Sequence, residues 1–238
     1  MVYVILSVMP FLAGIVQGVT GFGSAIVMMM ALPFYFLLPQ AAGVAGAISV
    51  MVSGAMVIRY RKSVSVKKAL IPTVLFIIIC TVTISLSTKI DPALIKKIFG
   101  AFLVLLSVYF LFINKAAGNM KITLPVAILF IVISALCDSL FGIGGPLMVL
   151  YFLSQTNSTK EYLGTIQLFF FINGVYNTVF RFARGILGLE HLLYFAIGAV
   201  CILLGLAVAN RIVDRLNADV IRKLTYIMIG ISGIVNLF

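Results

Sequence analysis

Two glycine-rich breaks hold the residues of this sequence that are best suited to chemistry. The first is the run QGVTGFGS at residues 17–24, and the second is DSLFGIGGP at residues 138–146. Each interrupts a long apolar stretch, and glycine at this density ends a helix because it loses the most backbone entropy on folding. Where a helix restarts after such a break, its first N–H groups lack partners and its dipole places partial positive charge there. The spacing therefore predicts an anion-binding site at the breaks.

The predicted substrate site takes residues from both breaks. They are Gln17, Thr20, Gly21, Gly23 and Ser24 from the first, and Asp138, Ser139, Gly142, Gly144 and Gly145 from the second. Hydroxyl groups of Thr20, Ser24 and Ser139 can add hydrogen-bond donors. The alternative is that the glycines only let helices approach closely. We assign that packing role to Gly14, Gly46 and Gly54, which stand outside the breaks.

Asp138 is the only acidic residue well inside an apolar stretch, and Gln17 stands at the matching place in the first break. An ionisable residue in a membrane segment indicates a functional role. Burial favours the neutral form of a carboxyl group, which suits a residue that takes up and releases a proton during transport. A helix cap or a sodium ligand are the other two roles open to it. We expect no basic residue within the neighbouring apolar stretches to neutralise it.

A third polar group lies in the apolar stretch at 163–180. Asn173 and Asn177 are four residues apart and therefore share one helix face. Amides in a membrane helix either hydrogen-bond to a neighbouring helix or line a polar cavity. We add Asn173 and Asn177 to the predicted substrate site. Arg59 and Arg181 end matching stretches in the two halves, and we expect them at the membrane interface or at a mouth that attracts anions.

The composition assigns the chain to the polytopic helical membrane proteins. The 238 residues are 63% hydrophobic, too many for a soluble domain. The net charge of +11 lies mainly in short loops, where membrane topology and anionic lipids explain it better than nucleic acid. An all-α fold is therefore expected. The eight apolar stretches are 2–38, 40–58, 70–88, 94–113, 122–154, 163–180, 191–209 and 219–237.

These stretches form two repeats of four. Besides the two breaks, residues 91–98 resemble residues 217–224, where a turn and a basic pair begin the last stretch of each half. The expected units are a first transmembrane repeat at 1–118 and a second at 119–238. Each repeat opens with its glycine-broken stretch.

The orientation of the repeats depends on how the broken stretches cross the membrane. If each crosses once, the repeats are parallel and the Lys and Arg residues divide nine to eight between the two sides. If each is a re-entrant hairpin, the repeats are inverted and the division is twelve to five. The positive-inside rule favours hairpins, with the twelve-residue side cytoplasmic. The arms at 2–16 and 24–38, each about 15 residues or roughly 22 Å long, suit half-helices.

The sequence resembles the TauE/SafE family of sulfite and organosulfonate exporters. The resemblance lies in the FGIGGP run at 141–146, its weaker copy GFG at 21–23, the basic loop near Arg59 and the duplicated halves. The resemblance covers nearly the whole chain. It implies a secondary transporter of small anions such as sulfite, sulfonates, thiosulfate or small carboxylates. Ser24 and Ala25 stand where the family often has further glycines, so the substrate stays open.

Other classes of protein fit the sequence less well. An enzyme would need a nucleophile with a base or a metal cluster, yet the chain has one histidine, His191, and no paired intramembrane carboxylates. We expect no catalytic residue, metal or cofactor. An anion channel built on the same broken helices remains the alternative. The expected partners are a small anion, a proton or sodium ion for coupling, the lipid bilayer and a second copy of the chain in a homodimer. The expected location is the inner (cytoplasmic) membrane.

Overall fold

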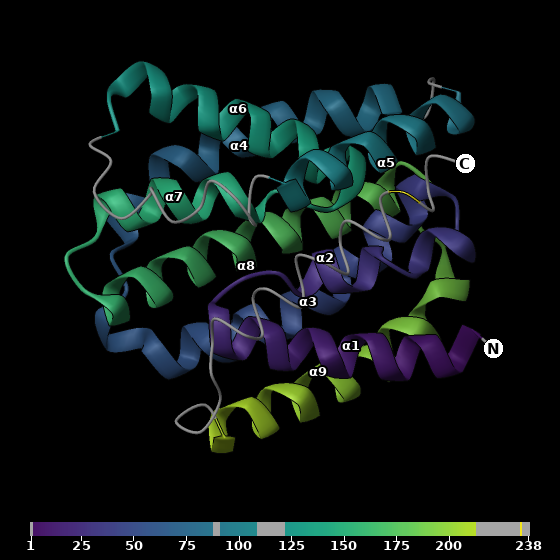
Figure 1. Cartoon of the computed structure of the whole chain (residues 1–238), viewed down its shortest axis with the longest axis horizontal. Helices are drawn as coiled ribbons and strands as arrows, with labels where there is room; N and C mark the ends of the chain where they lie inside the picture. Colours follow the sequence, from purple (N-terminus) through teal and green to yellow (C-terminus); the bar gives the residue numbers. More distant parts are fainter. Residues whose placement is uncertain (1, 88–90, 109–121, 213–233, 235–238) are drawn as a thin grey trace.

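The computed structural model describes residues 2–87, 91–108, 122–212 and 234, and these residues form helices and short connections without a β-strand (Figure 1). The helices are α1 (Val2–Thr20), α2 (Ser24–Met29), α3 (Leu38–Tyr60), α4 (Val66–Ser87), α5 (Pro92–Val108), α6 (Leu124–Phe141), α7 (Gly145–Gln155), α8 (Thr159–Ala183) and α9 (Leu192–Ile212), with 3-10 turns η1 (Leu32–Phe34), η2 (Arg61–Ser63) and η5 (Leu189–His191). Six of the described helical segments are long and apolar enough to cross a membrane. The predicted all-α membrane architecture is confirmed. The predicted stretch at 219–237 lies outside the described residues.

The first glycine break separates a long helix from a very short one. Gly21 and Gly23 adopt φ angles of 81° and 99°, in the left-handed region that other residues rarely enter. The N–H of Gly21 still donates to the Gln17 carbonyl at 2.8 Å, so α1 continues up to the break. α1 is longer than the arm predicted at 2–16, because it has 19 residues and runs to Thr20. A single glycine, Gly18, does not end the helix.

The second break has the same design with a longer helix after it. Gly142 ends α6 at φ 69°, and its N–H donates to the Asp138 carbonyl at 2.8 Å. The N–H of Ile143 then reaches the Cys137 carbonyl at 3.4 Å, which completes a glycine-type helix C-cap. Pro146 stands in the first turn of α7, where its missing N–H is not needed. The chain can therefore change direction here without losing backbone hydrogen bonds.

The chain turns back after each break (Figure 1). Tyr3 at the start of α1 and Phe36 after η1 both contact the ring of Tyr194, with ring centroids 6.0 and 5.4 Å apart. The chain has therefore returned by Phe36 to the end of the molecule at which α1 begins. In the second half, α7 runs back along α6, and the hairpin opens toward the opposite end of the molecule.

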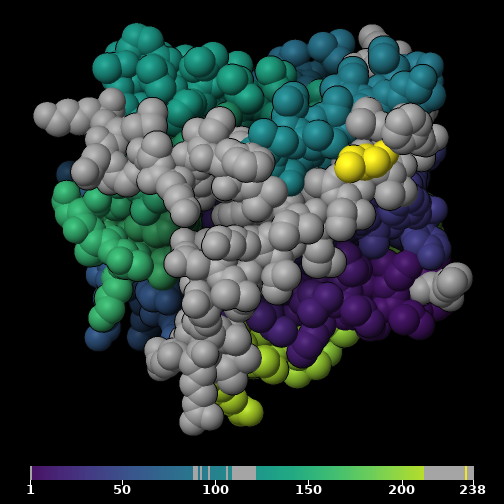
Figure 2. Space-filling model, in the orientation of Figure 1, coloured from purple at the N-terminus to yellow at the C-terminus, as the bar shows by residue number. Residues whose placement is uncertain are grey.

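Helix pairs from different halves form the interior. The α3 and α8 helices pack against each other, α1 packs along α9, and α4 packs along α6. Figure 2 shows the side chains of α1 lying against those of α9. A side chain at Gly14 would collide with the backbone of Ile202 on α9, and one at Gly54 would meet Phe171 on α8 at 3.0 Å. The packing role predicted for Gly14 and Gly54 is confirmed.

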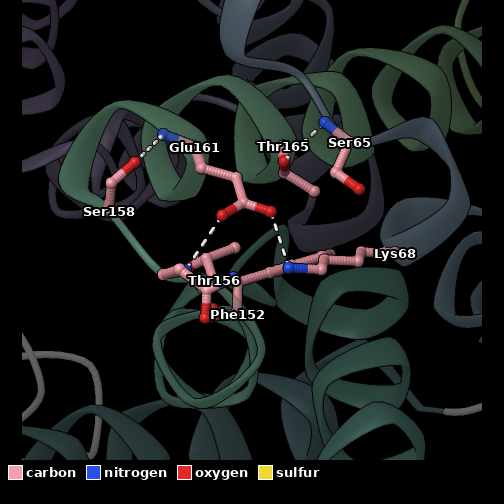
Figure 3. Close-up of polar contacts among 8 residues, drawn as sticks. Ser65, Lys68, Phe152, Thr156, Ser158, Glu161 and Thr165 are labelled. Carbon is pink, nitrogen blue, oxygen red and sulfur yellow. Dashed lines mark hydrogen bonds and ion pairs between the residues drawn. The ribbon is translucent and has the colours of Figure 1, made fainter.

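Polar contacts tie the α7–α8 connection to the start of α4 (Figure 3). Lys68 Nζ lies 2.6 Å from Glu161 Oε1, and Glu161 Oε2 accepts from the backbone N–H of Asn157 at 2.9 Å. The Ser158 hydroxyl caps α8 by accepting from the Glu161 N–H at 3.2 Å. These bonds fix the direction in which α8 enters the interior.

Candidate functional site

A cavity lies where the two breaks meet the faces of α3 and α8. It contains about 740 Å³ of space between atoms, a figure that includes space open to the outside, and about 80 Å³ of it can hold the centre of a water-sized sphere. Most of the residues predicted from the sequence line it. They are Gln17, Gly23, Ser24, Asp138, Gly142, Gly144, Gly145, Asn173 and Asn177. The fold therefore brings both breaks and the asparagine pair of α8 to one place.

Three predicted residues do not line the cavity. The hydroxyl of Thr20 interacts with the carbonyls of Val16 and Phe22, at 2.8 and 2.7 Å. The hydroxyl of Ser139 donates into its own helix at 2.6 Å, and Gly21 contributes a carbonyl to a neighbouring amide. These contacts hold the backbone of the breaks in place, and the contact of Thr20, Gly21 and Ser139 with substrate stays a prediction.

Gln17 links the first break to two other helices. Its Nε2 donates to Ser53 Oγ on α3 at 3.2 Å and to Gln167 Oε1 on α8 at 2.9 Å. Gln167 in turn donates from Nε2 to the Gly21 carbonyl at 2.5 Å. All three side chains are buried. This neutral network positions the first break and supplies no charge.

Asp138 holds the matching place in the second break and supplies a charge. Its Oδ2 accepts from Asn177 Nδ2 at 2.8 Å, and the backbone N–H of Gly144 donates to the same carboxyl group. Both bonds place donors on the carboxyl oxygens and fix the orientation of the side chain. The side chain lines the cavity, and its charge is open to a ligand there.

Arg181 was expected at the membrane interface or at a mouth that attracts anions, and the structure places it in the wall of the cavity. It lines the cavity, is 2% exposed, and interacts electrostatically with Asp138. Its Nη1 donates to the Pro39 carbonyl at 3.0 Å and its Nη2 to the Ser139 carbonyl at 2.6 Å. The expectation that Asp138 has no basic neighbour was therefore wrong. Asn173, Asn177 and Arg181 are spaced four residues apart, so the sequence could have indicated that Arg181 shares a helix face with the two asparagines.

The matching arginine of the first half has a different position. Arg59 is exposed at the end of α3, where its Nη1 donates to Asn210 Oδ1 on α9. The two arginines therefore differ in position, although both lie near the ends of long helices. Only Arg181 brings its charge into the cavity.

Small residues of α3 form the opposite wall. Ser49 and Ser53 line the cavity, and the hydroxyls of Ser24 and Ser49 lie 2.8 Å apart. Gly46 also lines it, and a Cβ built on Gly46 would have no atom within 4 Å. The predicted packing role of Gly46 was wrong, because this glycine leaves space open. In the sequence, small residues such as Gly46 and Ser49 look the same whether their helix face lines a cavity or packs against another helix.

Helix starts and aromatic rings complete the lining. Gly145 begins the 11-residue helix α7, and the N–H groups of such a first turn have no intrahelical partners. Phe76, Phe169 and Phe170 add apolar surface. The cavity thus combines one guanidinium, one carboxyl group, several amides and hydroxyls, and an apolar wall. This set can bind and orient a small anion, but in the described residues it includes no group of three His, Cys, Asp or Glu side chains that could hold a metal ion.

Comparison with known proteins gives one match. A family model described as sulfite exporter TauE/SafE matches residues 6–235. No curated protein and no solved structure matches the chain. The family match covers both breaks, the residues that line the cavity and all of the described helices apart from the first four residues of α1.

Proposed function

The chain belongs to the TauE/SafE family of sulfite exporters, which are multi-pass membrane transport proteins, and we propose that it moves a small sulfur-containing oxyanion through the cavity between its two glycine breaks. Membership of the family indicates that the protein exports sulfite or a related anion across a membrane. The choice of anion, the coupling to an ion and the roles of individual residues are our proposals.

The observation that carries the proposal is the buried guanidinium of Arg181 on the cavity wall. A guanidinium has five N–H donors, and the structure assigns two of them to carbonyl oxygens. The planar geometry of the group matches two oxygens of an oxyanion. The first turn of α7 and the hydroxyls of Ser24 and Ser49 supply further donors for the remaining oxygens.

We further propose that residues 1–118 and 119–238 are inverted repeats, each opening with a re-entrant hairpin. The helix pairing supports this, because exchange of the two halves turns the α1–α9 contact into the α6–α4 contact and keeps the α3–α8 contact. The opposite openings of the two hairpins in Figure 1 also support it. Broken helices that meet at the interface of such repeats are typical of transporter substrate sites.

The proposed orientation follows from the basic residues. The bond between Arg59 and Asn210 brings the ends of α3 and α9 together, and the Lys68–Glu161 pair brings the starts of α4 and α8 together. Figure 1 shows these ends on one side of the molecule. Because short basic loops stay in the cytoplasm, we propose that this side is cytoplasmic and that the protein resides in the inner membrane.

A ligand panel tests the proposed function. Purified protein is heated with sulfite, sulfoacetate, thiosulfate, sulfate, lactate or chloride, since a ligand that binds the folded state raises the melting temperature. We expect sulfite or another sulfur oxyanion to give the largest rise. A rise with chloride alone, together with pore-like currents in bilayers, would instead favour the anion channel.

A further inference from the structure

Two amide oxygens in the cavity wall have no hydrogen-bond donor. Oδ1 of Asn173 and Oδ1 of Asn177 are both fully buried, and no group in the described part of the chain donates to either. The two residues are only 3% and 7% exposed. A buried oxygen without a partner is costly, and nearly all such atoms in native proteins have one. The two oxygens are therefore able to accept a hydrogen bond or to bind a cation.

The nitrogen of each amide fixes its orientation. Nδ2 of Asn173 donates to the Phe169 carbonyl at 2.8 Å, and Nδ2 of Asn177 donates to Asp138 Oδ2 at 2.8 Å. Turning either amide over would break this bond and set two oxygens against each other. Oxygen atoms are therefore the unpaired polar atoms at both positions.

The unpaired oxygens lie on one wall with a carboxyl group. Asn173 and Asn177 are one turn apart on α8, so their side chains are neighbours on one helix face. The Asp138 carboxyl group is hydrogen-bonded to Asn177, and all three residues line the cavity. Three oxygen-bearing side chains from α6 and α8 thus gather at one place.

None of the neighbouring donors in the described residues bonds to these two amide oxygens. Arg181 donates to two backbone carbonyls, and the hydroxyl of Thr178 donates to the Gly174 carbonyl at 2.7 Å. The hydroxyls of Ser24 and Ser49 bond to each other. An anion would be repelled by lone pairs on amide oxygens. A hydrogen-bond donor or a cation fits these oxygens, and the adjacent Asp138 carboxyl group favours a cation.

We propose that Asn173 Oδ1, Asn177 Oδ1 and the Asp138 carboxyl group form a sodium site beside the anion site. One carboxylate with two neutral oxygens suits a monovalent ion, because divalent cations in proteins rely on more oxygen ligands or on phosphate groups of a substrate. A proton on Asp138 would leave the Asn173 oxygen without a partner. The inference rests on the proposed function, since it identifies sodium as the coupling ion of that transport.

The charges of the cavity explain why the two ligands would bind together. Sodium at the Asp138 wall and an anion at Arg181 each meet a fixed charge of opposite sign and attract each other. Binding of one should therefore tighten binding of the other, and by the same factor in both directions.

A cation comparison on the purified full-length protein tests the sodium site. Melting temperatures are measured in sodium chloride and in potassium chloride at equal concentration, without substrate. We expect a higher melting temperature in sodium. The sodium effect should disappear in Asn173→Leu and persist in Asn173→Asp, which keeps an oxygen at this position. Asn210→Leu, at the exposed end of α9, is the matched control and should keep it.

A second measurement on the wild-type protein does not depend on variants that fold. Sulfite is added as its potassium salt, and its affinity is measured with and without sodium chloride. Tighter binding with sodium supports the site. Equal sulfite affinity in both salts, or a sodium effect that survives in folded Asn173→Leu, would overturn it. In that case sulfite binding itself would still support the proposed function, whereas loss of all anion binding would count against that function instead.

Discussion

Asp138 and Arg181 line the same cavity and interact electrostatically, yet no ion pair joins these two described residues. Each charge is held by its own neighbours. Arg181 donates to the carbonyls of Pro39 and Ser139, whereas Asp138 accepts from Asn177 and Gly144. Two opposite charges held in this way remain available to ligands. This arrangement is what an exporter needs if it binds an anion and a coupling cation together.

The coupling ion determines how binding depends on pH. Asp138 is faced by Arg181, Cys80 and Cys137, and of these groups only the Asp138 carboxylate loses a negative charge when it binds a proton in acidic solution. If sodium is the coupling ion, protons compete with it, and the sodium-dependent part of sulfite binding should weaken as the pH falls. If a proton is the coupling ion, sulfite affinity should rise instead.

The variant Asp138→Asn separates these two outcomes further. It removes the charge and the proton-binding group but keeps an oxygen, so sulfite should still bind while both the sodium effect and its pH dependence are lost. Sulfite titrations at several pH values, with sodium and with potassium, measure this. An Asp138→Asn protein with the sodium effect and pH profile of the wild type would assign Asp138 to capping the helix end alone.

Gly145 offers a clean test of the second break. A Cβ on Gly145 would have its nearest neighbours at 3.7 Å, in Phe170 and Phe22, whereas a Cβ on Gly144 would lie 2.8 Å from Asp138 Cβ and 2.9 Å from the Ser134 carbonyl. We expect Gly145→Ala to fold and to bind sulfite more weakly, because the methyl group enters the cavity. Gly144→Ala should reduce the yield of folded protein. Size-exclusion profiles and sulfite titrations distinguish the two effects, and a Gly145→Ala protein with unchanged affinity would place the anion elsewhere.

Gly46 allows the cavity to be filled in steps. A Cβ at this position meets no atom within 4 Å. Gly46→Ala should therefore raise the free energy of unfolding by about 0.5–1 kcal/mol through helix propensity alone. Gly46→Phe should fold but stop transport by occupying the cavity. Flux measurements in proteoliposomes check this prediction, and normal transport by a folded Gly46→Phe protein would show that the substrate passes by another route.

Cysteine labelling tests the proposed topology. In a background without the three native cysteines, single cysteines replace Lys62 and Asn157 on the basic end and Glu190 near the start of α9, all of them exposed. We expect Lys62→Cys and Asn157→Cys to react from the cytoplasmic side and Glu190→Cys from the other side. Labelling of Lys62→Cys and Asn157→Cys from opposite sides would contradict the hairpin arrangement.

The glycine breaks and the polar residues beside them could be predicted from the sequence. The glycines of the breaks form clusters in the sequence, and the four-residue spacing of Asn173 and Asn177 indicates a polar helix face. The length of α1 could not be predicted in the same way, because only the glycines at positions 21 and 23 adopt left-handed angles while Gly18 packs against α9.

Other features of the site depend on tertiary packing. Arg181 stands at a helix end, which suggests the membrane interface, and only the approach of α6 and the start of α3 supplies the carbonyls that hold it inside. Ser49 and Gly46 look like ordinary packing residues until α8 and the first break are placed opposite them. Local patterns give no information on these distant neighbours.

The central claim is that Arg181 binds the transported anion. Equilibrium titration of sulfite against purified wild-type, Arg181→Gln, Arg181→Lys and Arg59→Gln proteins tests it most directly, with melting temperatures to confirm folding. Hydrogen bonds to a charged group contribute about 1.5–3 kcal/mol, so Arg181→Gln should weaken sulfite binding about 10- to 150-fold. Arg181→Lys should be intermediate, and Arg59→Gln should match the wild type. Wild-type sulfite affinity in folded Arg181→Gln would contradict the account.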